Sequence, residues 1–166
     1  NIINVGRYTD QKDQLTLLKA INLIKDQVDI KLLIVGRGIK KNDLISYINL
    51  NNLKNNVQLV NFTKNPFNLI RSSDLFILTS LYEGLPNVLL EALTLKKFII
   101  STDCPTGPKE ILLNGKAGNL FKPGDYKQLS KLIINYKNNK VKELTKVKFG
   151  YKNLDRFDFD KNLKKY

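Results

Sequence analysis

Two patterns of apolar positions alternate along the chain. Short continuous apolar runs indicate strands buried on both faces, and between them apolar residues recur at helical spacing, as Leu15, Leu18 and Ile21 do. The runs predict strands over residues 2–5, 30–35, 57–60, 74–79, 98–101 and 118–121. The helical spacing predicts helices over 14–28, 41–50, 66–72, 87–95, 108–113 and 125–136, and a last helical stretch from 141.

Strands that alternate with helices predict an α/β fold. Its expected form is a doubly wound, Rossmann-like parallel sheet of about six strands with helices on both faces. The 166 residues contain no internal repeat and no linker, and are expected to form one domain. Ligands of such sheets bind at the carboxyl ends of the strands, and most of the unusual residues follow the strands, at 6–7, 36–38, 61–63, 83–84 and 102–107.

Two glutamates separated by seven residues are the most informative feature. Glu83 lies in the loop after the fourth predicted strand, and Glu91 lies within the helix expected to begin at Asn87. The neighbours of Glu91 are apolar, and a carboxylate in such a helix is costly to bury without a specific partner. Hydroxyl groups of a bound ligand would be one such partner.

Cationic residues flank the loop after the first strand. Arg7 and Lys12 lie beside the start of the first helix, where free amides and the helix dipole favour anions. A diphosphate would suit this position, although two solvated surface charges explain the pair equally well. Arg37 and Gly38 form either a loop that approaches a nucleotide or an ordinary turn.

Missing motifs exclude several classes of function. The chain lacks the full glycine fingerprint of dinucleotide-binding domains and the GKS/GKT phosphate loop. It contains no His, so this segment has no His-based acid–base catalysis and no His-containing metal site, and no metal site is expected. The single Cys104 has no evident base beside it, which favours a structural or ligand-lining role.

The net charge of +13 raises the question of an anionic partner. Lys and Asn are frequent throughout while Arg is scarce, which points to compositional bias and not to nucleic-acid binding. The charge is concentrated over residues 127–166. An anionic membrane surface is therefore kept as a candidate partner.

Taken together, these segments resemble the C-terminal half of family 4 retaining glycosyltransferases, which have the GT-B architecture. The resemblance covers nearly the whole chain. It is carried by Val5-Gly6-Arg7 with Lys12, by residues 33–38, by residues 73–80, by the segment from Glu83 to Glu91, by Ser101-Thr102-Asp103, and by residues 118–125.

The resemblance implies roles for ten residues. Arg7 and Lys12 would clamp the diphosphate of a nucleotide-sugar, stabilising charge as the nucleotide leaves, and no cofactor or metal would be needed. Glu83 would hold hydroxyls of the donor sugar, and Glu91 would accept hydrogen bonds from the ribose. The remaining contacts would be the backbone amides of Asn87 and Val88, and a base lying against Arg37, Gly38, Phe62 and Thr63. Pro86 and Asn61 depart from the family pattern, because Gly is usual at both positions.

The chain starts within a strand and without Met, so we expect it to be the donor-binding half of a two-domain enzyme whose N-terminal acceptor domain is absent. The expected reaction transfers a hexose or N-acetylhexosamine from a nucleotide-sugar to a cell-surface polysaccharide or lipid-linked glycan. The expected nucleotide is UDP. The expected location is cytoplasmic, or peripheral on the inner face of the membrane. The alternatives are a non-catalytic basic module for nucleic acid or acidic membrane, and a nucleotide-sugar isomerase, which usually carries His in this half.

Overall fold

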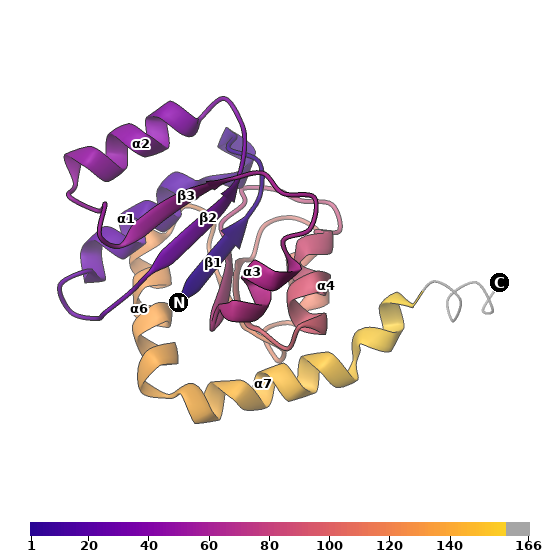
Figure 1. The fold of residues 1–166 in the computed structure, drawn as a ribbon. Helices are drawn as coiled ribbons and strands as arrows, with labels where there is room; N and C mark the ends of the chain where they lie inside the picture. The colour runs from indigo at the N-terminus through magenta and orange to yellow at the C-terminus, as the bar shows by residue number, and fades with distance from the viewer. Residues whose placement is uncertain (159–166) are drawn as a thin grey trace.

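A computed structural model describes residues 1–158. All six strands lie in one parallel sheet, in the order β3-β2-β1-β4-β5-β6 (Figure 1). The strands are β1 (Ile2–Val5), β2 (Leu32–Gly36), β3 (Val57–Asn61), β4 (Leu75–Leu78), β5 (Phe98–Thr102) and β6 (Asn119–Phe121). The α-helices are α1 (Gln14–Ile24), α2 (Lys41–Leu50), α3 (Phe67–Ser72), α4 (Asn87–Thr94), α5 (Pro108–Ile111), α6 (Tyr126–Asn138) and α7 (Lys140–Lys152). The predicted doubly wound α/β fold is confirmed.

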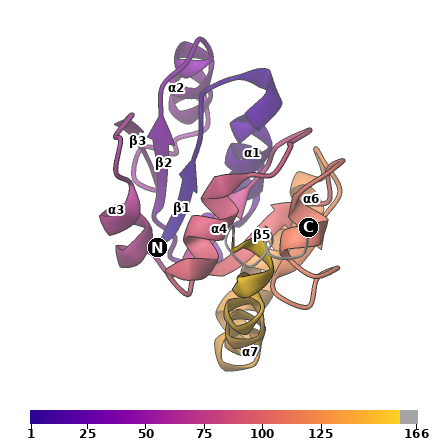
Figure 2. The same ribbon diagram turned by 90° about the vertical axis from the view of Figure 1, so that its right-hand side faces the viewer.

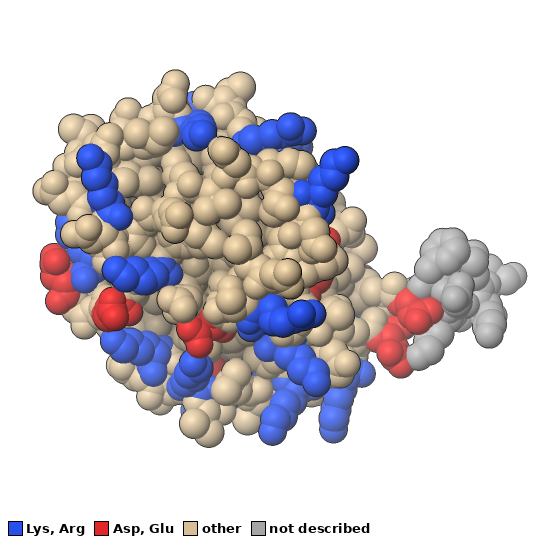
Figure 3. Space-filling view, in the orientation of Figure 1, with Lys and Arg blue, Asp and Glu red and all other residues tan. Residues whose placement is uncertain are grey.

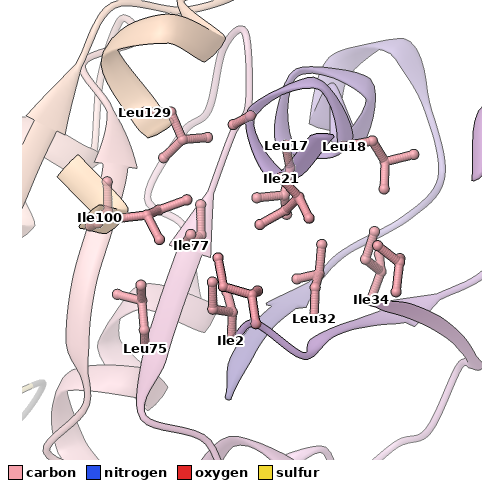
Figure 4. Close-up of a cluster of buried hydrophobic side chains, with 14 of the residues drawn as sticks. Ile2, Leu17, Leu18, Ile21, Leu32, Ile34, Leu75, Ile77, Ile100 and Leu129 are labelled. Carbon is pink, nitrogen blue, oxygen red and sulfur yellow. The ribbon is translucent and has the colours of Figure 1, made fainter. Parts of the chain in front are cut away.

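The central strands β1, β2, β4 and β5 bury both of their faces, so the sheet separates two cores. One core joins the strands to α1, α2 and α6, and Figure 4 shows Leu17 and Ile21 of α1 and Leu129 of α6 facing strand residues such as Ile77. The other core packs the opposite side chains of the strands against α3, α4 and α5. The two ribbon views agree, with α1 and α6 on one side of the sheet and α3 and α4 on the other (Figures 1 and 2).

Helix faces differ in part from the predicted ones. Leu15 was expected to face inward, but its side chain is exposed, and α1 instead buries Leu17, Leu18, Ile21 and Ile24. In α2, Ile45 is exposed, whereas Leu44 and Ile48 are buried. Both exposed residues lie at the edge of an apolar stripe, where the position of the neighbouring element decides which side chain is covered.

The C-terminal elements lie away from the carboxyl ends of the central strands. Helix α7 crosses the lower side of the molecule in Figure 1 and contacts β5, α4 and α6. A short 3-10 helix, Leu154–Phe157, follows it. Among residues 1–158, no helix combines the length and the apolar character that a bilayer-spanning helix requires. Residues 159–166, which belong to the predicted basic C-terminal stretch, are outside the described part of the chain.

Candidate functional site

A cleft of about 530 Å³ opens at the carboxyl ends of β1 to β4. The chain runs from β1 outward to β2 and β3 and then returns to place β4 on the other side of β1, so the cleft lies where the strand order reverses. Ligand sites in doubly wound sheets occur at this point. Nine of the ten predicted site residues line the cleft: Arg7, Lys12, Arg37, Phe62, Thr63, Glu83, Asn87, Val88 and Glu91.

The loop after β1 supplies the two predicted cations. A short 3-10 helix, Asp10–Lys12, carries Lys12, whose backbone carbonyl accepts a hydrogen bond from the Thr79 hydroxyl at 2.8 Å. The carbonyl of Arg7 accepts a bond from Gln14 Nε2 at 2.9 Å, which fixes its backbone while its side chain stays exposed. No group within residues 1–158 forms an ion pair with Arg7, so its charge is available to an anion in the cleft.

Glu83 and Lys12 form an ion pair inside the cleft. Lys12 Nζ donates to Glu83 Oε1 at 2.5 Å, and the two side chains are only 15% and 7% exposed. The Ser80 hydroxyl donates to the same oxygen at 2.6 Å. Each charged group here compensates the desolvation of the other, as buried ionised side chains require. The pairing was not predicted, because Lys12 was expected to face a diphosphate and Glu83 a sugar.

The segment 103–107 holds the loop that carries Glu83. The Thr106 hydroxyl donates to the backbone carbonyl of Glu83. Gly107 has a φ of 81°, and a Cβ there would lie 2.0 Å from the carbonyl oxygen of Gly84 and 2.5 Å from Pro86 Cδ. Thr106 and Gly107 thus both lie against the glutamate loop. They support the site from behind.

Cys104 lies in the same segment and is buried. Burial raises the pKa of its thiol, which disfavours the thiolate that a nucleophile needs. This environment agrees with the structural or ligand-lining role that the sequence favours over a nucleophile.

Glu91 is half-buried in the middle of α4, where its carboxylate reaches the wall of the cleft. Desolvation raises its pKa, which means that the surrounding protein disfavours the charged form. Within residues 1–158 the carboxylate accepts no hydrogen bond and forms no ion pair. Glu91 is therefore an acceptor without a protein donor, at a position that a ligand can reach.

The first turn of α4 opens into the cleft between the two glutamates. Pro86 precedes the helix, and no side chain caps its N-terminus. The first backbone bond of the turn runs from the Leu89 amide to the Pro86 carbonyl at 2.9 Å, so the amides of Asn87 and Val88 remain unpaired within residues 1–158. Such amides, together with the helix dipole, favour an anion or a hydroxyl oxygen.

The loops after β2 and β3 form the other wall. The guanidinium of Arg37 stacks over the Phe62 ring, 4.7 Å from its centre, and both side chains are exposed. Gly38, the tenth predicted residue, does not line the cleft. It lies against the backbone of Tyr8, where a Cβ would come within 2.3 Å of the Tyr8 carbonyl oxygen. Its lack of a side chain allows two loops to approach each other.

Several residues of the site were missed at the sequence level. Ser80 contacts Glu83, and Lys64, Pro66 and Leu85 also line the cleft. Tyr8 supports the wall from below, because its buried hydroxyl lies 3.0 Å from the Ile34 carbonyl and 2.9 Å from the Val60 carbonyl. Burial raises the pKa of Tyr8 to about 12. Their positions after strands were the available signal, but nothing in their spacing singled them out.

The arrangement can bind an anion through Arg7 and the first turn of α4, and hydroxyl groups through the two glutamates. On the far wall of the cleft, the stacked side chains of Arg37 and Phe62 offer a surface for a planar group. Among residues 1–158, no three His, Cys, Asp or Glu side chains come together as a metal site would require.

Comparison with known proteins places the chain in a family. The family described as glycosyl transferases group 1 matches residues 1–153. An uncharacterised glycosyltransferase of Methanocaldococcus jannaschii is 45% identical over 135 residues, covering 73% of this chain and 33% of the relative. A Campylobacter jejuni enzyme named as a 4-alpha-N-acetylgalactosaminyltransferase acting on a diphospho-undecaprenol glycan is 33% identical over 119 residues, covering 72% and 32%. The chain thus spans about a third of the length of these relatives.

Solved structures show the same fold. A Staphylococcus aureus TarM mutant, crystallised with UDP and other ligands, superimposes with a TM-score of 0.86 at 25% identity, covering 93% of this chain and 32% of TarM. The pneumococcal O-GlcNAc transferase GtfA, in complex with UDP and GlcNAc, has a TM-score of 0.84 at 21% identity, covering 99% and 34%. From the family match over residues 1–153, the chain belongs to the glycosyl transferases group 1 family.

Proposed function

We propose that the chain is the C-terminal, donor-binding half of a family 4 retaining glycosyltransferase with the GT-B architecture. The observation that carries this proposal is the unpaired carboxylate of Glu91, which lies in the same cleft as the exposed cation of Arg7. A nucleoside diphosphate supplies both missing partners at once, since its phosphates are anionic and its ribose offers two hydroxyl donors. The relatives, which are named glycosyltransferases, support the same reading.

In the proposed complex, Arg7 and Lys12 face the diphosphate and stabilise the charge that develops as the nucleotide leaves. Lys12 has donor capacity for this, because its ammonium group carries three protons and only one bond to Glu83 is formed. The amides of Asn87 and Val88 add uncharged donors at the start of α4. The base lies against Arg37, Phe62 and Thr63. Gly38 would act on the base only indirectly, through the position of the loop.

The donor is proposed to be a UDP-linked hexose or N-acetylhexosamine. UDP is the nucleotide named in the TarM and GtfA complexes. The acceptor is proposed to be a polysaccharide or a lipid-linked glycan, as the Campylobacter relative's name describes for that enzyme. Binding of the acceptor and turnover are assigned to a longer protein, in which a second domain closes the cleft. We expect residues 1–166 alone to bind donor without transferring sugar.

Calorimetric titration with UDP, with and without a chelator, tests the proposal. We expect binding in both conditions. Glu91→Gln should weaken UDP binding by on the order of 1–3 kcal/mol, the scale of a hydrogen bond to a charged group. Glu110→Gln is the matched control, since Glu110 is an exposed acid outside the cleft and its loss should leave binding unchanged.

Deoxyribose analogues of UDP locate the contact. They should lose a similar amount of affinity for the native chain and little for Glu91→Gln, because the mutation and the analogue remove the same hydrogen bond. Losses that simply add would show that Glu91 does not touch the ribose. The absence of binding to any nucleoside diphosphate, or a strict need for a divalent metal, would contradict the proposed function itself.

A second candidate partner is an anionic membrane surface, for a cytoplasmic protein held at the inner face. Figure 3 shows basic side chains along the lower edge of the molecule, over α7. Lys142, Lys148 and Lys152 have no ion-pair partner within residues 1–158, and Val141 of the same helix is 86% exposed. Cosedimentation with vesicles containing phosphatidylserine should fall when these three lysines are changed to Gln. Equal binding to nucleic acid would instead favour the basic-module alternative.

A further inference from the structure

Glu83 has two carboxylate oxygens in different environments. Oε1 accepts both the Lys12 ammonium at 2.5 Å and the Ser80 hydroxyl at 2.6 Å. Oε2 accepts no hydrogen bond within residues 1–158, and it is not sealed in the interior, because Glu83 lines the cleft. A carboxylate offers about four acceptor sites. Both protein donors thus occupy one side of the group and leave the other side for a ligand.

Lys12 alone would not maintain this asymmetry. An ammonium has three donors on a flexible stem, so it can bridge both oxygens of a carboxylate or follow the group as it rotates. A second donor that is fixed in space removes this freedom. Ser80 meets that requirement because it is fully buried, and its backbone carbonyl accepts a bond from the Thr102 hydroxyl at 2.7 Å.

Ser80 is also placed to coordinate two loops. Its neighbour Thr79 donates to the Lys12 carbonyl at 2.8 Å. Two successive residues at the end of β4 therefore hold the backbone of Lys12 and the carboxylate of Glu83. The Thr106 hydroxyl holds the Glu83 carbonyl from the next loop. Hydroxyl groups of neighbouring residues therefore fix the orientation of the ion pair. The attraction between the two charges alone does not have to do so.

We propose that Ser80 is a positioning residue that fixes the Glu83 carboxylate so that Oε2 is presented to the hydroxyl groups of the donor sugar. This inference rests on the proposed function. It assigns the Ser80 hydroxyl to recognition of the sugar, separate from recognition of the nucleotide. In the proposed complex the nucleoside diphosphate meets Arg7, Lys12, the start of α4 and Glu91, and within residues 1–158 no hydrogen bond joins any of these groups directly to Ser80.

Ser80→Ala removes the hydroxyl and leaves the Lys12–Glu83 pair in place. Calorimetry should compare UDP with UDP-glucose, UDP-galactose, UDP-N-acetylglucosamine and UDP-N-acetylgalactosamine. For the native chain, at least one sugar should bind more tightly than UDP. In Ser80→Ala that advantage should fall by roughly tenfold, the value of one hydrogen bond to a charged group, while UDP affinity changes less than about twofold.

Ser101→Ala is the matched control. Ser101 is equally buried at the end of the neighbouring strand, and within residues 1–158 its hydroxyl donates only to the Thr102 carbonyl, at 3.2 Å. It should keep the advantage of the sugar over UDP, and circular dichroism should show that both variants are folded. A purely structural role for Ser80 would weaken UDP and the UDP-sugar equally, and it would overturn the inference.

The remaining outcomes are also decisive. If the native chain binds UDP but gains nothing from any of the four sugars, or if Ser80→Ala keeps the full gain, the positioning role is wrong while the proposed function stands. If the native chain binds neither UDP nor any UDP-sugar, the proposed function fails, and the role of Ser80 fails with it.

Discussion

The two glutamates of one short motif occupy opposite electrostatic situations. Glu83 is only 7% exposed in its side chain but has two protein partners, Lys12 and Ser80. Glu91 is more open and has none within residues 1–158, and its pKa is raised by desolvation. In the proposed complex, burial alone therefore does not identify the acid that binds the ribose. The better indicator is a polar group that the protein has partly desolvated and left without a partner.

The largest expected effect on stability comes from disturbing the loop of Glu83 without touching the helix of Glu91. Glu83 lies on the loop that packs against Gly107, whereas Glu91 lies on α4. Gly107→Ala would place a Cβ 2.0 Å from the Gly84 carbonyl and force an alanine into a φ of 81°. We expect a loss of about 3 kcal/mol or more in unfolding free energy, since backbone must move. Urea denaturation measures it.

Gly124→Ala is the control for Gly107→Ala. Gly124 has a φ of 77°, but a Cβ there would meet no atom within 4 Å. It should cost only the backbone term, about 1 kcal/mol. Equal losses in the two variants would show that the contact between Gly107 and the glutamate loop has no energetic weight.

The next largest effect on stability is expected from breaking the ion pair between Glu83 and Lys12. Glu83→Gln leaves the ammonium of Lys12 desolvated and without its counter-charge, so we expect a loss of about 2–3 kcal/mol in unfolding free energy. The double variant Lys12→Met/Glu83→Gln should recover part of this loss, because both charges are gone. Strict additivity of Lys12→Met and Glu83→Gln in a double-mutant cycle would mean that the pair is not coupled.

The smallest expected effect on stability is that of Glu91→Gln, and it is a gain and not a loss. A carboxyl group whose pKa is raised on folding is disfavoured when ionised, so Glu91 costs stability once the pH exceeds its unfolded value of 4.5, and this cost is absent below it. Glu91→Gln should therefore be more stable than the native chain at pH 7, by less than about 1 kcal/mol because the carboxylate is still partly exposed to solvent. Denaturation at pH 4 and pH 7 should show the advantage only at pH 7.

Saturating UDP sharpens the same comparison. If UDP supplies the missing donors, it should abolish the advantage of Glu91→Gln at pH 7 and stabilise the native chain more than the variant. A variant that is less stable than the native chain without ligand would show that Glu91 already has a partner in the folded protein.

Much of the fold could be predicted from periodicity. Apolar runs such as 98–101 are long enough to require burial on both faces, and this requirement specifies a parallel sheet. Strand ends were less accurate: the predicted strand 74–79 is observed as Leu75–Leu78, and just beyond its end the Thr79 hydroxyl donates to the carbonyl of Lys12. The exposure of Leu15 and Ile45 depends on neighbouring elements, which periodicity does not describe.

The candidate site was predictable where residue chemistry conflicts with its surroundings. Glu91 among leucines and Arg7 at the start of a helix are such conflicts, and both line the cleft. Ser80 is different, since a serine after an apolar strand is unremarkable until the loop turns back to bring Glu83 within 2.6 Å. The pairing of Lys12 with Glu83 was missed for the same reason, since the two residues are 71 positions apart.

The reversal of strand order at β1 has a consequence for how such proteins diversify. The loops with Arg37 and Phe62 follow strands on one side of β1, whereas Glu83 and the start of α4 follow β4 on the other. Only the loop of Arg7 and Lys12 lies between them. In the proposed complex, the preference for a nucleobase and the preference for a sugar would thus depend on different loops that share one phosphate-binding loop. Either preference could change in evolution without substitutions in the loops that determine the other.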